Sequence, residues 1–372
     1  MKKSVKLVKS VKNIFKIYRF SAIMVMWCGM RNIYGMTALE LENYFLSIND
    51  KKFRAQQIYE GLYKKRVKNF DEIMNIPNSI KKNLKEDFSN EFISIIKVQK
   101  GTDVNKYLFK LFDGNMVEAV LMKHDYGNSL CISSQVGCNM GCKFCESGRL
   151  KKIRNLEAYE MVMQILLVEE SIFDRITHIV IMGIGEPFDN YDNVMKFIKI
   201  INHPKGIAIG SRHITVSTCG LVPGIYKFME EDGQVNLAIS LHAPIDEIRD
   251  KIMPVNKAYK INEVIEATKK YIEKTGRRVT FEYVLLKDIN DSSKCAKDLS
   301  KLVRGINCYI NLIPYNETNN IEFKRSDKNR VMNFYDILKK EKINVTIRRE
   351  FGGNIDAACG QLRANNMEKE EQ

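Results

Sequence analysis

Three closely spaced cysteines constrain this chain more than any other feature of its sequence. Cys138, Cys142 and Cys145 follow a C-x3-C-x2-C spacing, and Phe144 stands directly before the last of them. Structural zinc sites and simple electron-transfer clusters normally use four protein ligands. Three thiolates instead fit a four-iron cluster that keeps one iron open for a small molecule. A zinc knuckle whose fourth ligand lies elsewhere in the chain is the alternative.

Length, charge and cysteine content limit the class of protein. The 372 residues, 45% of them hydrophobic, suffice for one large catalytic domain and a small accessory one. A net charge of +14 favours a polyanionic partner such as nucleic acid. Nine cysteines, an odd number, do not fit a secreted disulfide scaffold. Because a thiolate-bound cluster needs reducing surroundings, we expect a cytoplasmic protein. We also expect a monomer that does not bind a membrane.

The pattern of charged and apolar residues divides the chain into five segments. Residues 1–29 form a basic and apolar extension, too short in its apolar part to span a bilayer, and either dispensable or a misassigned start. Residues 30–100 predict a helical accessory domain that either only packs or docks RNA. Residues 101–130 predict a β-hairpin linker region turning at Asp113-Gly114. The catalytic domain is expected at 131–365, followed by a charged tail at 366–372.

From residue 130 onward, apolar runs of strand length alternate with helical stretches. We expect strands at 130–133, 178–182, 214–217, 235–240, 279–285 and 309–313, a further strand at 345–348, and helices at 157–173, 191–201, 225–230, 261–274 and 292–303. Such alternation predicts a parallel α/β sheet. Six repeats are too few for a closed eight-stranded barrel. The sequence therefore predicts a six-stranded partial barrel, open on one side, with room for a large substrate.

Short polar motifs follow four of these strands at their carboxyl ends, where parallel α/β folds bind ligands. The motifs are Gly183-Ile-Gly-Glu-Pro187, Ser217-Thr-Cys-Gly220, Ser240-Leu-His-Ala-Pro244 and Pro314-Tyr-Asn316. Glu186 can accept a hydrogen bond from an ammonium group, and Ser217 can bond a ribose or a carboxylate. His242 is either a general base or a structural residue of its loop. Each motif is common by itself, but together they predict a ligand site at this end of the barrel.

The ordered set of motifs resembles that of the radical S-adenosylmethionine (SAM) RNA adenine methyltransferases, the RlmN/Cfr family. The similarity runs from about residue 36 to 363 and includes CNMGCKFC, MGIGEP, ITVSTCG, AISLHAP, NLIPYN and NIDAACGQLR. It implies an α/β fold, the radical-SAM partial (β/α)6 barrel, with a small N-terminal helical domain. It also implies one [4Fe-4S] cluster held by Cys138, Cys142 and Cys145. The SAM site would be lined by Gly185, Glu186, Ser217, Ser240, Leu241, His242 and Asn316.

The resemblance implies catalytic roles for Cys359, Cys131 and Glu118. A first SAM would methylate Cys359, and a second SAM would yield a radical that abstracts hydrogen from that methyl group, so that two SAM are used per turnover. The methylene radical would add to an adenine carbon, and Cys131 would then attack the Cys359 sulfur, release the RNA and leave a transient disulfide. Glu118 matches the position of the family's proton acceptor. A radical route suits C2 of adenine, because that carbon is not nucleophilic.

The implied substrate is an adenosine of 23S rRNA, methylated at C2, together with an adenosine of the tRNA anticodon loop. Pro187 in the Gly-Glu-Pro motif favours the C2 branch of the family. A flavodoxin or ferredoxin would supply the electron. One alternative is Cfr-type methylation at C8 of the same rRNA adenosine, which confers antibiotic resistance. The alternative from another class is a non-catalytic iron–sulfur or zinc RNA-binding protein.

Overall fold

The computed structural model describes residues 30–90, 92–318, 322–348 and 361–362. The chain divides after Glu91 into two compact units, and each is described by itself. Within the described ranges, no helix is both long and apolar enough to cross a membrane.

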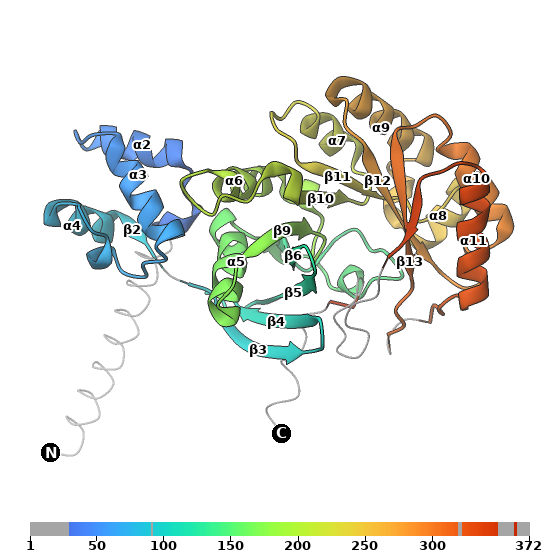
Figure 1. Ribbon diagram of the computed structural model, residues 1–372, viewed down its shortest axis with the longest axis horizontal. Helices are drawn as coiled ribbons and strands as arrows, with labels where there is room; N and C mark the ends of the chain where they lie inside the picture. The colour runs from blue at the N-terminus through green and yellow to red at the C-terminus, as the bar shows by residue number, and fades with distance from the viewer. Residues whose placement is uncertain (1–29, 91, 319–321, 349–360, 363–372) are drawn as a thin grey trace, which may run out of the picture. The chain divides into compact units, whose positions relative to one another are not determined.

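The first unit is a small helical domain, as the sequence predicts (Figure 1). It contains α2 (Ala38–Ser47), α3 (Phe53–Tyr59), a π-helical turn (Glu60–Lys64) and α4 (Asn78–Asp87), and the short strands β1 (Arg31–Asn32) and β2 (Phe88–Ser89) pair in parallel. Thr37 and Glu40 form a capping box that starts α2, because each side chain accepts from the other's backbone N–H. Tyr34 and Tyr63 are buried together, and the Tyr63 hydroxyl donates to the Tyr34 carbonyl at 2.8 Å.

One sheet of ten strands forms the second unit (Figure 1). Its order is β14-β13-β12-β11-β10-β9-β6-β5-β4-β3. The strands are β3 (Ser94–Lys100), β4 (Val104–Lys110), β5 (Met116–His124), β6 (Gly127–Ile132), β9 (Ile176–Ile181), β10 (Ile214–Thr218), β11 (Asn236–Ser240), β12 (Val279–Leu285), β13 (Cys308–Pro314) and β14 (Val345–Ile347). From β6 to β14 every pairing is parallel, which confirms the predicted partial barrel and its additional C-terminal strand.

Helices follow the parallel strands along the chain (Figure 1). They are α5 (Ala158–Ile172), α6 (Tyr191–Asn202), α7 (Val222–Phe228), α8 (Asp246–Ile252), α9 (Ile261–Thr275), α10 (Ser293–Leu302) and α11 (Lys328–Lys340). The five expected helices are present, and α8 and α11 are additional. The seven-residue α8 is too short for helical spacing to be distinctive, yet it contributes to the site described below.

The strand register decides which side chains face the inside of the barrel. Residues paired across neighbouring strands lie on the same face of a sheet. The pairs Cys131–Val180, Val180–Thr215, Ser217–Ala238, Ser240–Glu282 and Glu282–Asn311 therefore trace one face across six strands. This face carries Cys131, Ser217, Ser240 and Glu282, and Glu118 belongs to it because Cys131 pairs with Val120.

The structure differs from the expected segment limits around residue 100. Ser94–Lys100 forms β3, pairs with β4 and belongs to the second unit, although the sequence suggested helical residues up to 100. The expected hairpin at 101–130 is consequently part of an antiparallel extension, β3 to β5, joined to the barrel through β6. As an edge strand with a bulge between Ile95 and Lys97, β3 buries neither face fully, so its sequence does not alternate.

Candidate active site

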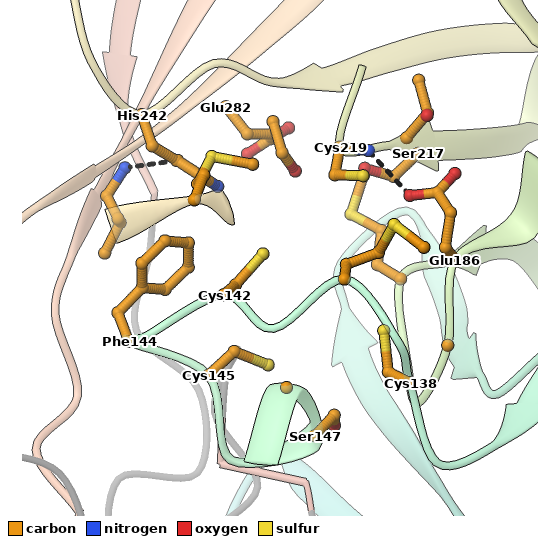
Figure 2. Close-up of a pocket in the computed structure, with 18 of the residues that line it drawn as sticks. Cys138, Cys142, Phe144, Cys145, Ser147, Glu186, Ser217, Cys219, His242 and Glu282 are labelled. Atoms are coloured by element: carbon orange, nitrogen blue, oxygen red, sulfur yellow. Dashed lines mark hydrogen bonds between the residues drawn. The ribbon is translucent and has the colours of Figure 1, made fainter. Parts of the chain in front are cut away.

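The three motif cysteines lie on one loop between β7 (Gln135–Val136) and the turn Glu146–Arg149, and all three line a single cavity (Figure 2). The loop closes on itself through backbone hydrogen bonds. The Cys138 N–H donates to the Leu150 carbonyl at 2.9 Å, and the Gly148 N–H donates to the Cys145 carbonyl at 3.0 Å. These backbone hydrogen bonds hold the loop that carries the three cysteines.

Two glycines allow this loop to close. Gly137 has a φ of +75°, and a Cβ there would lie 2.3 Å from the Lys151 carbonyl oxygen. A Cβ on Gly148 would lie 2.6 Å from the carbonyl oxygen of Cys142. Contacts this short with backbone atoms exclude any side chain, so the conformation of the cysteine loop depends on glycine at both positions.

We expect the change Gly148→Ala to reduce iron loading severalfold, because the added methyl group must push the Cys142 backbone away from its position. Gly210→Ala is the matched control, since a Cβ at Gly210 meets no atom within 4 Å. The measurement is iron and sulfide per chain after anaerobic reconstitution, with circular dichroism to show an intact fold. Equal iron content in the two variants would contradict the proposed fit of this loop.

The thiol chemistry fits a thiolate-bound cluster. Burial raises the pKa of Cys138 to about 12 and that of Cys142 well above its ordinary value, and neighbouring cysteines add to both effects. The free thiols consequently stay protonated at neutral pH, and metal binding has to release their protons. Three thiols on one side of a cavity, with the remaining wall supplied by the barrel, are a donor set that fits an iron–sulfur cluster with three protein ligands.

Glu186 joins two of the strand-end loops. Its carboxylate is buried and accepts from the backbone N–H of Phe188 at 3.0 Å and from that of Cys219 at 2.8 Å (Figure 2). Burial raises the pKa of this carboxyl group, and the two N–H donors act in the opposite direction. Gly185 beside it has a φ of +111° and lies against Gln135. Both carboxylate oxygens of Glu186 thus accept hydrogen bonds from backbone N–H groups. From the sequence we expected Glu186 to accept from an ammonium group, and this structural role was not predicted.

The expected SAM-site residues divide into two groups. Gly185, Glu186, Ser217, Ser240 and His242 line the same cavity as the three cysteines. Leu241 and Asn316 are not among the lining residues. Leu241 is fully buried and donates its N–H to the Glu282 carbonyl, while Asn316 directly follows the lining residue Tyr315.

His242 has the geometry of a structural residue rather than a general base. Its backbone is left-handed, with a φ of +56°, and its Nδ1 accepts from the Val284 N–H at 3.0 Å (Figure 2). The ring meets Phe144 edge to face, with centroids 4.8 Å apart. Burial lowers the pKa of His242 to about 3. The imidazole therefore stays neutral at physiological pH, and Nδ1 is occupied.

The burial of neutral His242 makes the free energy of unfolding depend on pH. The folded pKa of about 3 lies below the unfolded value near 6.5. Between pH 6.5 and pH 3, His242 is therefore protonated in the unfolded chain but neutral in the folded protein. The free energy of unfolding is largest above pH 6.5 and decreases as the pH falls through this range. The loss from this site should be about 1.4 kcal/mol per pH unit.

The change His242→Asn tests this effect. Asparagine tolerates the left-handed backbone and keeps an acceptor near Nδ1, but it does not titrate. Urea unfolding between pH 7.5 and 5 should show a shallower pH dependence in this variant than in the wild type. The exposed His213→Asn is the control. Because His213 acts on the pKa of the neighbouring His178, we expect at most a slight change, and the slope should stay closer to that of the wild type than the slope of His242→Asn does. An unchanged slope in His242→Asn would disprove the assignment.

Cys131 lies beside the cavity rather than in its wall. It is buried in an apolar cluster with Val120, Met122, Ile184 and Leu362, and Met182 both packs against this cluster and lines the cavity. Glu118 is likewise buried and outside the lining, with its carboxylate 3.2 Å from the Lys106 ammonium. Both predicted catalytic residues thus face the inside of the barrel but lie outside the cavity lining.

Cys359 lies outside the described residues, but Leu362, three positions later, is described. The Ser147 hydroxyl donates to the Leu362 carbonyl at 2.8 Å, and the Leu362 side chain packs in the cluster that contains Cys131. Ser147 follows Cys145 by two residues in the cysteine loop. The described part of the C-terminal segment therefore connects the cysteine loop with the surroundings of Cys131.

Sequence reasoning missed several residues of the cavity wall. Glu282 is buried there, accepts from the Asn311 side chain at 2.8 Å, and has its pKa raised by burial and lowered by nearby Arg348. A single carboxylate within the apolar run Val279–Leu285 was the available signal. The wall also contains Met140, Met253, Val284 and Ile313. Buried carboxylates and hydroxyls beside this apolar surface suit a ligand that has a charged end and an aromatic ring, as SAM does.

Comparisons with known proteins agree with this architecture. The model of the radical SAM superfamily matches residues 132–298, and the model of the ribosomal RNA large subunit methyltransferase N-terminal domain matches residues 31–89. Relatives from Listeria welshimeri and Enterococcus faecalis, each named dual-specificity RNA methyltransferase RlmN, are 51% identical over 348 residues. The alignments cover 91% of this chain and 95% and 98% of the two relatives.

A solved structure agrees as well. The crystal structure of a radical SAM methyltransferase from Sphaerobacter thermophilus is 39% identical and superposes with a TM-score of 0.85. The match covers 90% of this chain and 99% of that protein.

A partial barrel with three thiols at the mouth of its cavity defines a radical SAM enzyme, and this class uses a [4Fe-4S] cluster and SAM. The chain belongs to the RlmN family of radical SAM RNA methyltransferases. The predicted family, fold and enzyme class are therefore confirmed. Neither the Cfr-type alternative nor a non-catalytic iron–sulfur or zinc protein is favoured.

Proposed function

We propose that this enzyme methylates C2 of an adenosine in 23S rRNA and of an adenosine in the tRNA anticodon loop, using two SAM per turnover. The names of the relatives, dual-specificity RNA methyltransferases, support two RNA substrates. The observation that carries the proposal is the position of Cys131, an inward-facing cysteine outside the three-cysteine motif that packs beside the cavity lined by the motif cysteines.

The cavity residues would bind and orient the cofactors. Cys138, Cys142 and Cys145 would hold the cluster, which when bound would provide the one electron that SAM cleavage requires. The carboxylate of Glu186 fixes the loops after β9 and β10, and Ser217 and Ser240 present hydroxyls to the ligand. The apolar wall excludes water from the reacting atoms.

Cys359 and Cys131 would carry the methyl group and release the product. Cys359 would accept the methyl group on its sulfur. After the 5′-deoxyadenosyl radical removes a hydrogen atom from that methyl group, the carbon would add to the adenine ring, which then gives up its ring proton and one electron. The Cys131 thiolate would attack the Cys359 sulfur and break its bond to the methylene carbon, which takes up a proton and leaves with the RNA as a methyl group. The resulting disulfide is reduced by a cellular thiol before the next turnover. Glu118 takes the proton from the adenine carbon, and the Lys106 ammonium offsets its negative charge.

The helical unit would dock RNA. It presents exposed lysines at Lys51, Lys52, Lys64, Lys65 and Lys68, and basic side chains of this kind neutralise phosphates. The match to a ribosomal RNA methyltransferase N-terminal domain supports this role. A flavodoxin or ferredoxin would deliver the electron, and the enzyme would act as a cytoplasmic monomer.

An in vitro assay tests the substrates separately. Anaerobically reconstituted enzyme is incubated with SAM, a reductant and either a 23S rRNA fragment or a tRNA transcript, and digested nucleosides are analysed by mass spectrometry. We expect 2-methyladenosine in both RNAs, and none with Cys359→Ala. Product in the rRNA alone would remove tRNA from the proposal, and 8-methyladenosine would overturn the C2 assignment.

A further inference from the structure

A fully buried cation lies close to the cysteine loop. The guanidinium of Arg249, on α8, is 0% exposed. It donates to the carbonyl oxygens of Cys219 at 2.7 Å, Leu241 at 3.1 Å and Ser240 at 3.2 Å, and to the Asn256 side chain at 3.0 Å. Over the described ranges no carboxylate contacts this guanidinium. Buried charges are normally paired, so a cation solvated only by neutral oxygens needs an explanation.

The same helix is attached to the cysteine loop. The Ile252 carbonyl, one turn after Arg249, accepts from the N–H of Lys143 at 2.9 Å, and Lys143 directly follows Cys142. Ile252 and Met253 belong to one apolar cluster with Phe144, and Cys142 and Cys145 pack against that cluster. The carbonyls that Arg249 binds belong to the strand-end loops of the cavity. Arg249 thus joins the wall of the SAM cavity to the cysteine loop.

The hydrogen bonds of Arg249 lead in two directions. Toward the barrel, the guanidinium binds the carbonyl oxygens of Cys219 and Ser240, two residues that line the same cavity as the three motif cysteines. Away from these carbonyls it donates to Asn256, whose amide donates in turn to Asp246 at 2.9 Å and to Asp250 at 2.7 Å. Asp250 is also paired with Lys260 at 3.0 Å. The guanidinium is therefore bonded directly to the cavity residues and reaches carboxylates only through Asn256.

We propose that Arg249 is a positioning residue that supplies the counter-charge for the iron–sulfur cluster and makes the cluster easier to reduce. Reduction adds one electron from the donor protein to a site that already carries three thiolates. A fixed positive charge in a poorly screened interior stabilises the reduced state more than the oxidised state. This inference rests on the cluster at Cys138, Cys142 and Cys145, but it is independent of the RNA substrate.

The test is a redox titration of the reconstituted protein, followed through the electron paramagnetic resonance signal of the reduced cluster. For Arg249→Gln we expect the ratio of reduced to oxidised cluster at a fixed potential to fall roughly tenfold, which corresponds to about 59 mV for one electron. Arg249→Lys keeps the charge with fewer hydrogen bonds and should stay near the wild-type potential. Lys260→Gln removes a half-exposed cation of the same network and should also leave the potential unchanged.

A wild-type potential in cluster-loaded Arg249→Gln would overturn the proposal. A drop in Arg249→Lys as large as that in Arg249→Gln would also overturn it, because lost hydrogen bonds rather than lost charge would then be responsible. If the glutamine variant does not load a cluster, Asp246→Asn gives a test of opposite sign. It removes a negative charge and keeps an accepting oxygen for Asn256, so the potential should rise; no change or a fall would refute the inference. RNA methylation is not measured, so these results remain distinct from those that test the substrate.

Discussion

Replacing Cys142 with alanine is expected to abolish iron loading and the reductive cleavage of SAM. Two thiolates cannot hold a four-iron cluster, and the loop that closes around Gly148 contains no cysteine besides Cys138, Cys142 and Cys145. Iron, sulfide and 5′-deoxyadenosine per chain are measured after anaerobic reconstitution. Cys219→Ala is the matched control, because Cys219 lines the same cavity but lies outside the C-x3-C-x2-C motif.

The control variant should keep the wild-type content of iron and sulfide. A Cys142→Ala protein that cleaves SAM at the wild-type rate would contradict the assignment of the cluster to this loop. Loss of iron in Cys219→Ala but not in Cys142→Ala would instead make Cys219 a ligand.

Cys131→Ala should trap RNA on the protein. The radical addition through Cys359 does not need Cys131, but the release step does, so the product should stay covalently attached. Intact-protein mass spectrometry after nuclease digestion should show a nucleotide adduct in this variant. The double variant Cys131→Ala, Cys359→Ala should carry no adduct, since it lacks the attachment point.

Cys308→Ala is the control for the loss of a buried cysteine, because Cys308 lies in β13 away from the described cavity lining. It should purify without RNA and keep its activity. A Cys131→Ala enzyme that is free of RNA and still makes methyladenosine would refute the disulfide step.

The architecture could be predicted because its signals are local. The strand at 279–285 was expected with the bounds that the structure gives to β12, and the other parallel strands agree within a few residues. Runs of apolar residues at strand length, separated by helical spacing, depend only on neighbouring positions. The strand-end motifs could be assembled in the same way, because a parallel sheet brings all carboxyl ends to one edge.

The parts of the site that the sequence did not predict depend on contacts between segments that are far apart in the chain. Glu282 stands in an apolar run, and only the pairing with Ser240 shows that it faces the cavity. The importance of Arg249 follows from contacts with loops on two different strands, which no local pattern in α8 indicates. Cys131 and Leu362 lie far apart in sequence, so no local pattern predicts that they pack in the same apolar cluster.

The most direct test of the account is the nucleoside content of ribosomal RNA in a host that lacks its own C2 methyltransferase. Expression of this chain should restore 2-methyladenosine, and the Cys359→Ala variant should not, although it is made at the same level. No resistance to drugs of the peptidyl-transferase centre is expected. The appearance of 8-methyladenosine with multidrug resistance would contradict the C2 assignment, and the absence of any methyladenosine from a soluble, cluster-loaded enzyme would contradict the proposed function itself.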